Sequence, residues 1–149
     1  MDLAPSFLPL LGSWTGLERH EASPAGPATT ARASLVLKLD VAATVVVQDY
    51  RRVQADGDEL SGHGVFLAEP GTDTVLWWFF DSTGQVPAPA RGHFQGGALV
   101  LDQPRGWGRA RHHLQAAGDR LDHRVEQQPT GSRTWSTLAV GVHRRLSGH

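Results

Sequence analysis

The stretch that most constrains the fold spans residues 60–82 and reads LSGHGVFLAEPGTDTVLWWFFDS. Near its middle, Pro70 fixes one φ angle and Gly71 tolerates a positive one, which is what a tight reversal of the chain requires. The residues after the turn, 75–80, are β-branched, aromatic or large, and no polar residue recurs among them at helical spacing. The sequence therefore predicts an antiparallel hairpin whose second strand is apolar on both faces.

The first limb of this hairpin has two unlike faces. One face carries Gly62 and Gly64, and the other carries His63, Val65 and Leu67. Glycine inside a strand marks sharp curvature or a bulky neighbour lying close, and the aromatic residues of the second limb are available to fill that space. If the more apolar face points inward, His63 points inward with it.

Length and composition are typical of one globular domain, which we expect to span residues 1–149. Hydrophobic residues make up 40% of the chain and charged residues 19%, which argues against disorder. The 14 basic and 15 acidic residues are mixed along the sequence without a basic stripe, so no nucleic-acid partner is expected. The absence of cysteine excludes disulfides, thiolate chemistry and cysteine-based zinc sites.

No segment predicts secretion or insertion into a membrane. Residues 1–12 have no basic residue ahead of their apolar run, unlike a signal peptide. No apolar run approaches the ~18 residues of a membrane span. We therefore expect a cytoplasmic protein without a membrane partner.

Before the hairpin, strand patterns alternate with turn signals. Residues 5–11 are apolar but interrupted by Pro9, which predicts a short helical turn that plugs an opening. A strand is expected from residue 12 to about residue 20, followed by a loop over 23–30. Alternation of apolar and polar residues predicts a half-buried strand at 32–39. A further strand is expected at 43–53, with Thr44, Val46, Gln48 and Tyr50 on one face.

Beyond the hairpin, short strand patterns recur at regular intervals. A loop with two prolines is expected at 83–89, followed by strands at 91–95, 98–102, 107–115, 120–127 and 133–146. About ten strands with short connections favour up-and-down neighbours, and such a meander removes its exposed edges only by closing. The expected fold is therefore all-β, a single antiparallel up-and-down β-barrel that encloses a cavity.

Both ends of the sequence resemble the calycin barrels of lipocalins and fatty-acid-binding proteins. The segment GSWTG at 12–16 and a late basic residue, Arg144 or Arg145, carry this resemblance. It implies that Trp14 lies at the closed end of the barrel with the late arginine stacked on its ring. Such a cation–π pair is worth ~0.5–2 kcal/mol.

A more specific resemblance is to an uncharacterised bacterial calycin-like family of unknown function. It rests on DYRR at 49–52, GHGV at 62–65, WFFDS at 78–82 and the closing residues 134–145. Two positions depart from that family, because Trp78 stands where histidine is expected and His143 where tyrosine is expected. No activity is established for the family, so the resemblance implies a barrel fold and no reaction.

Polar and aromatic residues at inward positions are the candidates for ligand binding. His112 and His123 share the apolar phase of their strands, so with His63 they are expected either to line one cavity or to be buried structural histidines. The hydroxyl of the only tyrosine needs a partner, and the aspartate that ends the aromatic strand has a turn-forming alternative. The full candidate set is Tyr50, His63, Trp78, Asp81, His112 and His123.

The residues favour no cofactor, although heme and a divalent metal stay open. Zinc would need three or four converging ligands, and no HxH or HExxH spacing occurs. The related nitrobindin barrels hold heme through a histidine on a late strand, which makes His143 the candidate by resemblance. Fatty-acid carriers clamp a carboxylate with a late tyrosine that this chain lacks, although Arg109, Arg111 and Arg124 are available for an acid group.

The leading interpretation is a binding module, a barrel that holds a small, mostly apolar ligand. An enzyme in which a histidine acts as base or metal ligand is the alternative, although neither a GxSxG elbow nor a cysteine supports nucleophilic catalysis. A third interpretation is a structural or homodimeric protein that uses the strand of Trp77 and Trp78, whose side chains face opposite ways.

Overall fold

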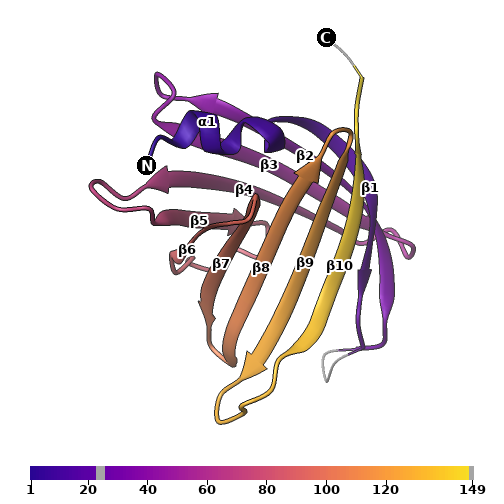
Figure 1. Cartoon of the computed structure of the whole chain (residues 1–149). Helices are drawn as coiled ribbons and strands as arrows, with labels where there is room; N and C mark the ends of the chain where they lie inside the picture. The colour runs from indigo at the N-terminus through magenta and orange to yellow at the C-terminus, as the bar shows by residue number, and fades with distance from the viewer. Residues whose placement is uncertain (23–25, 148–149) are drawn as a thin grey trace.

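A computed structural model describes residues 1–22 and 26–147, in which ten antiparallel strands close into a barrel. Each strand pairs with its neighbours in sequence, and the first strand pairs with the last to complete the ring (Figure 1). The strands are β1 (Gly12–His20), β2 (Thr29–Asp40), β3 (Val45–Gln54), β4 (Glu59–Ala68), β5 (Val75–Asp81), β6 (Ala90–Gln95), β7 (Ala98–Arg105), β8 (Gly108–Ala117), β9 (Arg120–Pro129) and β10 (Ser136–Arg145). The predicted fold class, a closed up-and-down barrel, is confirmed.

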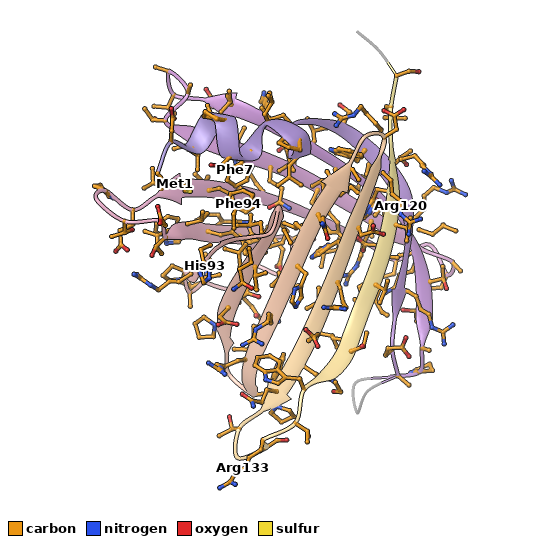
Figure 2. The ribbon with its side chains drawn as sticks, in the orientation of Figure 1. Met1, Phe7, His93, Phe94, Arg120 and Arg133 are labelled. Atoms are coloured by element: carbon orange, nitrogen blue, oxygen red, sulfur yellow. The ribbon has the colours of Figure 1, made fainter. Side chains whose placement is uncertain are left out.

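A short helical segment, α1 (Leu3–Phe7) followed by the 3-10 turn η1 (Leu8–Leu10), lies across one end of the barrel (Figure 1). Phe7 points from it into the barrel and lies beside Phe94 (Figure 2). Its ring centroid lies 5.1 Å from that of Phe66 and 5.3 Å from that of Phe94. The apolar run at 5–11 therefore closes one end, as predicted. No helix in the described ranges is long and apolar enough to cross a bilayer.

The closed end is fastened by Trp14 and Arg145. The guanidinium carbon of Arg145 lies 4.2 Å from the centre of the fully buried Trp14 ring. The same guanidinium donates to the backbone carbonyls of Leu11 at 2.5 Å and Pro9 at 3.1 Å, while the indole N–H donates to Leu10 at 3.0 Å. The expected cation–π pair is confirmed, and its cation is the second of the two late arginines.

The inward face of β4 is its glycine face, because aromatic rings from the neighbouring strand occupy the space above it. A Cβ atom on Gly62 would lie 2.0 Å from Cζ of Phe79. A Cβ atom on Gly64 would lie 2.2 Å from Oε1 of Gln48 and 2.7 Å from Nε1 of Trp77. The prediction that these glycines make room for close bulky neighbours is confirmed.

The prediction that His63 points into the barrel is wrong, because the interior takes the opposite face of β4. The His63 side chain is 51% exposed, and its Nδ1 lies 2.8 Å from Oδ1 of Asp49 on the outer surface. On β5, Trp77 is buried inside, whereas Trp78 alternates to the outer face with the 52% exposed Phe80. Two of the six candidate residues therefore lie outside the barrel.

Strand positions agree with the predicted pattern, with differences at the ends. The inward residues of β2 are Ala31, Ala33, Leu35 and Leu37, as the alternation predicts. β7 continues through Pro104 to Arg105, and β10 begins at Ser136 rather than at 133. Within the loop expected at 23–30, residues 23–25 lie outside the described part of the chain and β2 already begins at Thr29.

Replacing the arginine of the closed end should destabilise the barrel. Arg145→Ala removes the cation–π contact and the hydrogen bonds to backbone carbonyls, so we expect the free energy of unfolding to fall by about 2–3 kcal/mol. Arg144→Ala, at the exposed neighbouring position, is the matched control and should change it by less than about 0.5 kcal/mol. Urea denaturation followed by tryptophan fluorescence measures both. Equal losses in the two variants would contradict this role of Arg145.

Candidate functional site

The half of the barrel away from the helical segment encloses an open cavity of about 380 Å³. The closed half is filled by the apolar core, which includes Phe7, Trp14, Phe66 and Leu99. The apolar walls of the cavity are Leu60, Trp77, Phe79, Trp107, Val125 and Leu138. The polar side chains that line it include Glu18, His20, Gln48, Tyr50, Asp81, Gln103, His112 and His123.

Glu18 reaches the cavity because it lies on the same face of β1 as Trp14, four residues along the strand. The strand register places small residues on both sides of it, Ala31 of β2 and Gly141 of β10. A Cβ atom on Gly141 would lie 2.9 Å from Cε1 of His143 and 3.1 Å from Cγ of Glu18, so the glycine makes room for both side chains. Glu18 is only 4% exposed and must therefore be compensated by polar neighbours.

Those neighbours are a tyrosine and two histidines. The hydroxyl of Tyr50 donates a hydrogen bond to Oε1 of Glu18, and Nε2 of His20 lies 3.4 Å from the same oxygen. Nε2 of His143 lies 3.6 Å from Oε2, just beyond hydrogen-bond length. Burial alone would raise the pKa of Glu18, but these imidazoles and the hydroxyl hold that pKa well below its usual range. Glu18 is therefore an ionised carboxylate inside the barrel.

The protonation of Tyr50 follows from the same contact. Burial first, and then the charge of Glu18, raise the pKa of the Tyr50 hydroxyl far above its usual value. The hydroxyl therefore keeps its proton near neutral pH and donates it in the hydrogen bond to Glu18. Short hydrogen bonds of this charge-assisted kind are stronger than neutral ones.

A second polar chain joins Gln103, His112 and His123. Oε1 of Gln103 lies 3.1 Å from Nε2 of His112, and Nδ1 of His112 lies 3.2 Å from Nε2 of His123. Burial is the main reason that the pKa of His112 lies well below its usual value and that of His123 is about 4. Both imidazoles are therefore neutral near pH 7.

Because both imidazoles are neutral, the donor and the acceptor of each hydrogen bond among Gln103, His112 and His123 can be assigned. Arg105 also points at Oε1 of Gln103, at 3.4 Å, and an arginine only donates, so this amide atom is an acceptor. His112 therefore carries its proton on Nε2 and accepts on Nδ1 from the Nε2–H of His123. The remaining nitrogen, Nδ1 of His123, is left as a bare acceptor, with no hydrogen-bond partner among the described residues.

The structure brings together four of the six predicted ligand-binding residues. Tyr50, Asp81, His112 and His123 all line the cavity, whereas His63 and Trp78 lie on the outer surface. The hydrogen bonds from the backbone N–H of Thr83, at 2.9 Å, and from its hydroxyl also give Asp81 the turn-forming role expected as its alternative. A role in ligand binding stays a prediction for all six.

The geometry does not fit heme ligation by His143. This residue is 1% exposed, does not line the cavity, and has its Nε2 facing Glu18. Because the ring is almost fully buried, it is enclosed rather than presented to a ligand, although neither of its nitrogens has a hydrogen-bond partner among the described residues. Within residues 1–22 and 26–147, no group of three or more His, Asp or Glu side chains is arranged to hold a metal ion.

The three arginines considered for a fatty-acid head group lie outside the barrel. Arg109 and Arg111 stack on the ring of Trp135 at 5.3 and 4.1 Å, and Arg111 pairs with Asp102 at 2.9 Å. Arg124 is exposed on β9 and lies 3.8 Å from Glu126. The arginines that line the cavity are instead Arg52 and Arg105, at the ends of their strands.

The most informative residue, Glu18, was not among the candidates. The inward orientation of Glu18 could have been predicted from the sequence, because residues 14, 16, 18 and 20 alternate onto one face and Trp14 was expected to be buried. Gln48 was placed on the face of Tyr50, and it accepts a hydrogen bond from the indole N–H of Trp77 at 3.0 Å. The contributions of Gln103 and Gly141 depend on cross-strand register, for which the sequence carried no signal.

Comparisons with known proteins show the fold and no family. No family model matches the chain, and no curated protein matches it in sequence. Among solved structures, the S-type phycobiliprotein lyase CPES from Guillardia theta has a TM-score of 0.74 at 13% identity, covering 100% of this chain and 95% of that chain. Rv2717c from M. tuberculosis has a TM-score of 0.73 at 20% identity, and the match covers 98% of this chain and 100% of that chain.

A third structure of the same fold is EF1p2_mFAP2b bound to DFHBI. Its TM-score is 0.50 at 11% identity, and the match covers 97% of this chain and 99% of that chain. At these identities the likeness is one of fold, and the side chains of this site have to be interpreted on their own.

The neutral histidine pair should make the protein less stable in mild acid. Because the pKa of His123 is about 4 when folded and about 6.5 when unfolded, the unfolded chain binds more protons between these values, so stability falls as pH falls through this window. We expect the Tm to be lower at pH 5 than at pH 7 by roughly 5 °C. His123→Gln should shrink this difference, as measured by differential scanning calorimetry. If the Tm difference between pH 5 and pH 7 were as large in His123→Gln as in the wild type, the assignment of His123 as a neutral buried histidine would be contradicted.

Proposed function

We propose that this barrel binds a small, mostly apolar molecule in the cavity that holds Glu18, Tyr50 and His123. The observation that carries the proposal is the coexistence of an open cavity of about 380 Å³ with polar atoms in its lining, such as Nδ1 of His123, that have no hydrogen-bond partner among the described residues. A barrel that served only as a packed scaffold would have filled this half with side chains, as it does in the closed half.

The size and lining of the cavity support a small organic ligand. Its volume lies at the lower end of the ~300–1,000 Å³ range of small-molecule pockets. Trp77 and Phe79 form one wall with ring centroids 5.5 Å apart, and Trp107 lies on the turn at the open end. Rigid aromatic walls with a few placed polar groups are the usual design of such pockets.

The polar groups are held in position before any ligand arrives. The Tyr50–Glu18 pair and the Gln103–His112–His123 chain each fix their side chains by hydrogen bonds, and the indole of Trp77 packs edge-on against His112 with centroids 4.8 Å apart. Because these side chains are already ordered, little side-chain conformational entropy is lost when a ligand binds.

Two proteins of the same fold support the proposal. EF1p2_mFAP2b is bound to DFHBI, a small molecule, and CPES is a phycobiliprotein lyase. Membership of the uncharacterised bacterial calycin-like family, a cytoplasmic location and a homodimer stay predictions. For the enzyme alternative, one of the three candidate histidines, His63, lies outside the barrel, and the inward pair is neutral and already hydrogen-bonded.

Ligand binding is tested first by native mass spectrometry of freshly purified protein and by a thermal-shift screen of small aromatic and aliphatic compounds. We expect one molecule bound per chain and a Tm that rises with ligand concentration, because a ligand that binds only the folded state stabilises it. A library that produces neither a bound species nor a concentration-dependent shift would count against the proposal.

Filling part of the cavity should weaken ligand binding without unfolding the barrel. Ala110 is buried on β8 and lines the cavity, so Ala110→Phe is expected to weaken any cavity ligand by about tenfold or more. Gln115→Phe adds the same ring to an exposed position of the same strand and should leave affinity within about twofold. Isothermal titration calorimetry measures both, with circular dichroism as the check on folding. Unchanged affinity in a folded Ala110→Phe variant would place the ligand elsewhere.

A further inference from the structure

The lining of the cavity includes two hydrogen-bond acceptors, Oε2 of Glu18 and Nδ1 of His123, that have no hydrogen-bond donor within 3.5 Å among the described residues. From this arrangement we infer that the ligand carries a positively charged nitrogen, a protonated amine or amidine on an apolar body, which docks against Glu18 and His123. This inference rests on the proposed binding function and adds the chemical class of the ligand. It concerns the orientation of the molecule as well, because the charged end enters first.

The first acceptor is Oε2 of Glu18. Its sister atom Oε1 receives the Tyr50 hydroxyl and lies 3.4 Å from His20, but the nearest nitrogen to Oε2 is Nε2 of His143 at 3.6 Å. No described residue donates a hydrogen bond to this oxygen. An ionised oxygen without a donor at the edge of a cavity is the natural partner of an N⁺–H group.

The second acceptor is Nδ1 of His123, whose proton is held on the opposite nitrogen by His112. The register places Glu18, Gly141 and His123 in one row across β1, β10 and β9. The two acceptors therefore lie on strands roughly 10 Å apart. The His143 imidazole covers the glycine between them, because a Cβ atom on Gly141 would lie 2.9 Å from Cε1 of His143. In this proposal the ammonium group approaches both acceptors from the cavity side of that ring.

The charges beside Glu18 and His123 select against an anion. A carboxylate ligand placed there would meet the ionised Glu18 and a bare imidazole lone pair, both of which repel it. Of the two arginines of the cavity, Arg105 points at Gln103 at 3.4 Å, and Arg52 lies near Tyr50 and also borders the surface groove beside Asp58 and Glu59. A cation is therefore favoured beside Glu18 and His123, and Arg52 and Arg105 are left for another part of the ligand.

The outer surface has a second hollow, for which the case for a ligand is weaker. A groove of about 420 Å³ runs over β6, β7 and β8 and includes Arg91 and Arg111. Arg91 already pairs with Glu69 at 3.0 Å and Arg111 with Asp102 at 2.9 Å, so neither guanidinium is waiting for an anion. Glu18, by contrast, has only histidines as its ion-pair partners among the described residues, and its Oε2 accepts no hydrogen bond within 3.5 Å.

Three probes that share one ring system separate the charge from the apolar body. Naphthylmethylamine is a cation at neutral pH, naphthylmethanol is neutral and naphthoic acid is an anion. Isothermal titration calorimetry on the full chain at pH 7 is expected to give an affinity about tenfold higher for the amine than for the alcohol, with the acid the weakest. This comparison in the wild-type protein needs no variant to fold.

Two variants test which carboxylate of the cavity causes the preference for the amine over the alcohol. Glu18→Gln should bring the affinities of amine and alcohol within about threefold of each other, while the affinity for the alcohol itself changes by less than about threefold. Asp81→Asn removes the other carboxylate of the cavity, which bonds to Thr83, and should keep the preference for the amine.

The outcomes separate the two proposals. Equal affinities for all three probes, or a preference lost in Asp81→Asn and kept in Glu18→Gln, would overturn the cation subsite and leave the binding function standing. If none of the probes binds at concentrations up to its solubility limit, both proposals are contradicted. A preference for the amine that only Glu18→Gln removes supports both.

Discussion

An ionised carboxylate inside a barrel must be compensated, and this requirement organises the polar half of the interior. Glu18 obtains its compensation from the hydroxyl of Tyr50 and from the neighbouring imidazoles of His20 and His143. These groups come from β1, β3 and β10, so they meet only when the first strand pairs with the last. Closure of the barrel and the burial of one charge are thus parts of the same arrangement.

One end of the barrel is packed for stability, and the other end holds the proposed ligand site. At the closed end, Phe7, Trp14 and Arg145 combine aromatic packing with hydrogen bonds to backbone carbonyls, and the apolar core fills the space completely around them. At the open end, small residues such as Ala110 and Ala139 line the cavity beside polar ones, whereas large apolar side chains fill the closed half. The residues of the ligand site can therefore change without destabilising the closed end of the barrel.

Turn signals and alternation were sufficient to predict the strands, their order and the closure, because each depends on neighbours in sequence. The interior of β4 was predicted wrongly, since apolar content was taken to mark the inward face. Glycines occupy that face instead, where the rings of Trp77 and Phe79 need the room, and His63 therefore points outward. Glu18 was missed because an acidic residue on a strand is usually exposed, and its compensation comes from strands distant in sequence.

The central claim is that the cavity lining carries a fixed negative charge, and its most direct test is the ionisation state of Glu18. Carbon-13 NMR of the glutamate side-chain carboxyl carbons, with Glu18→Gln to assign the signal, measures that state as pH is lowered from 7 to 4. The account predicts an ionised carboxylate throughout, although an ordinary glutamate is about half protonated near pH 4.3. A signal that titrates above that value, or is already protonated at pH 7, would contradict the account.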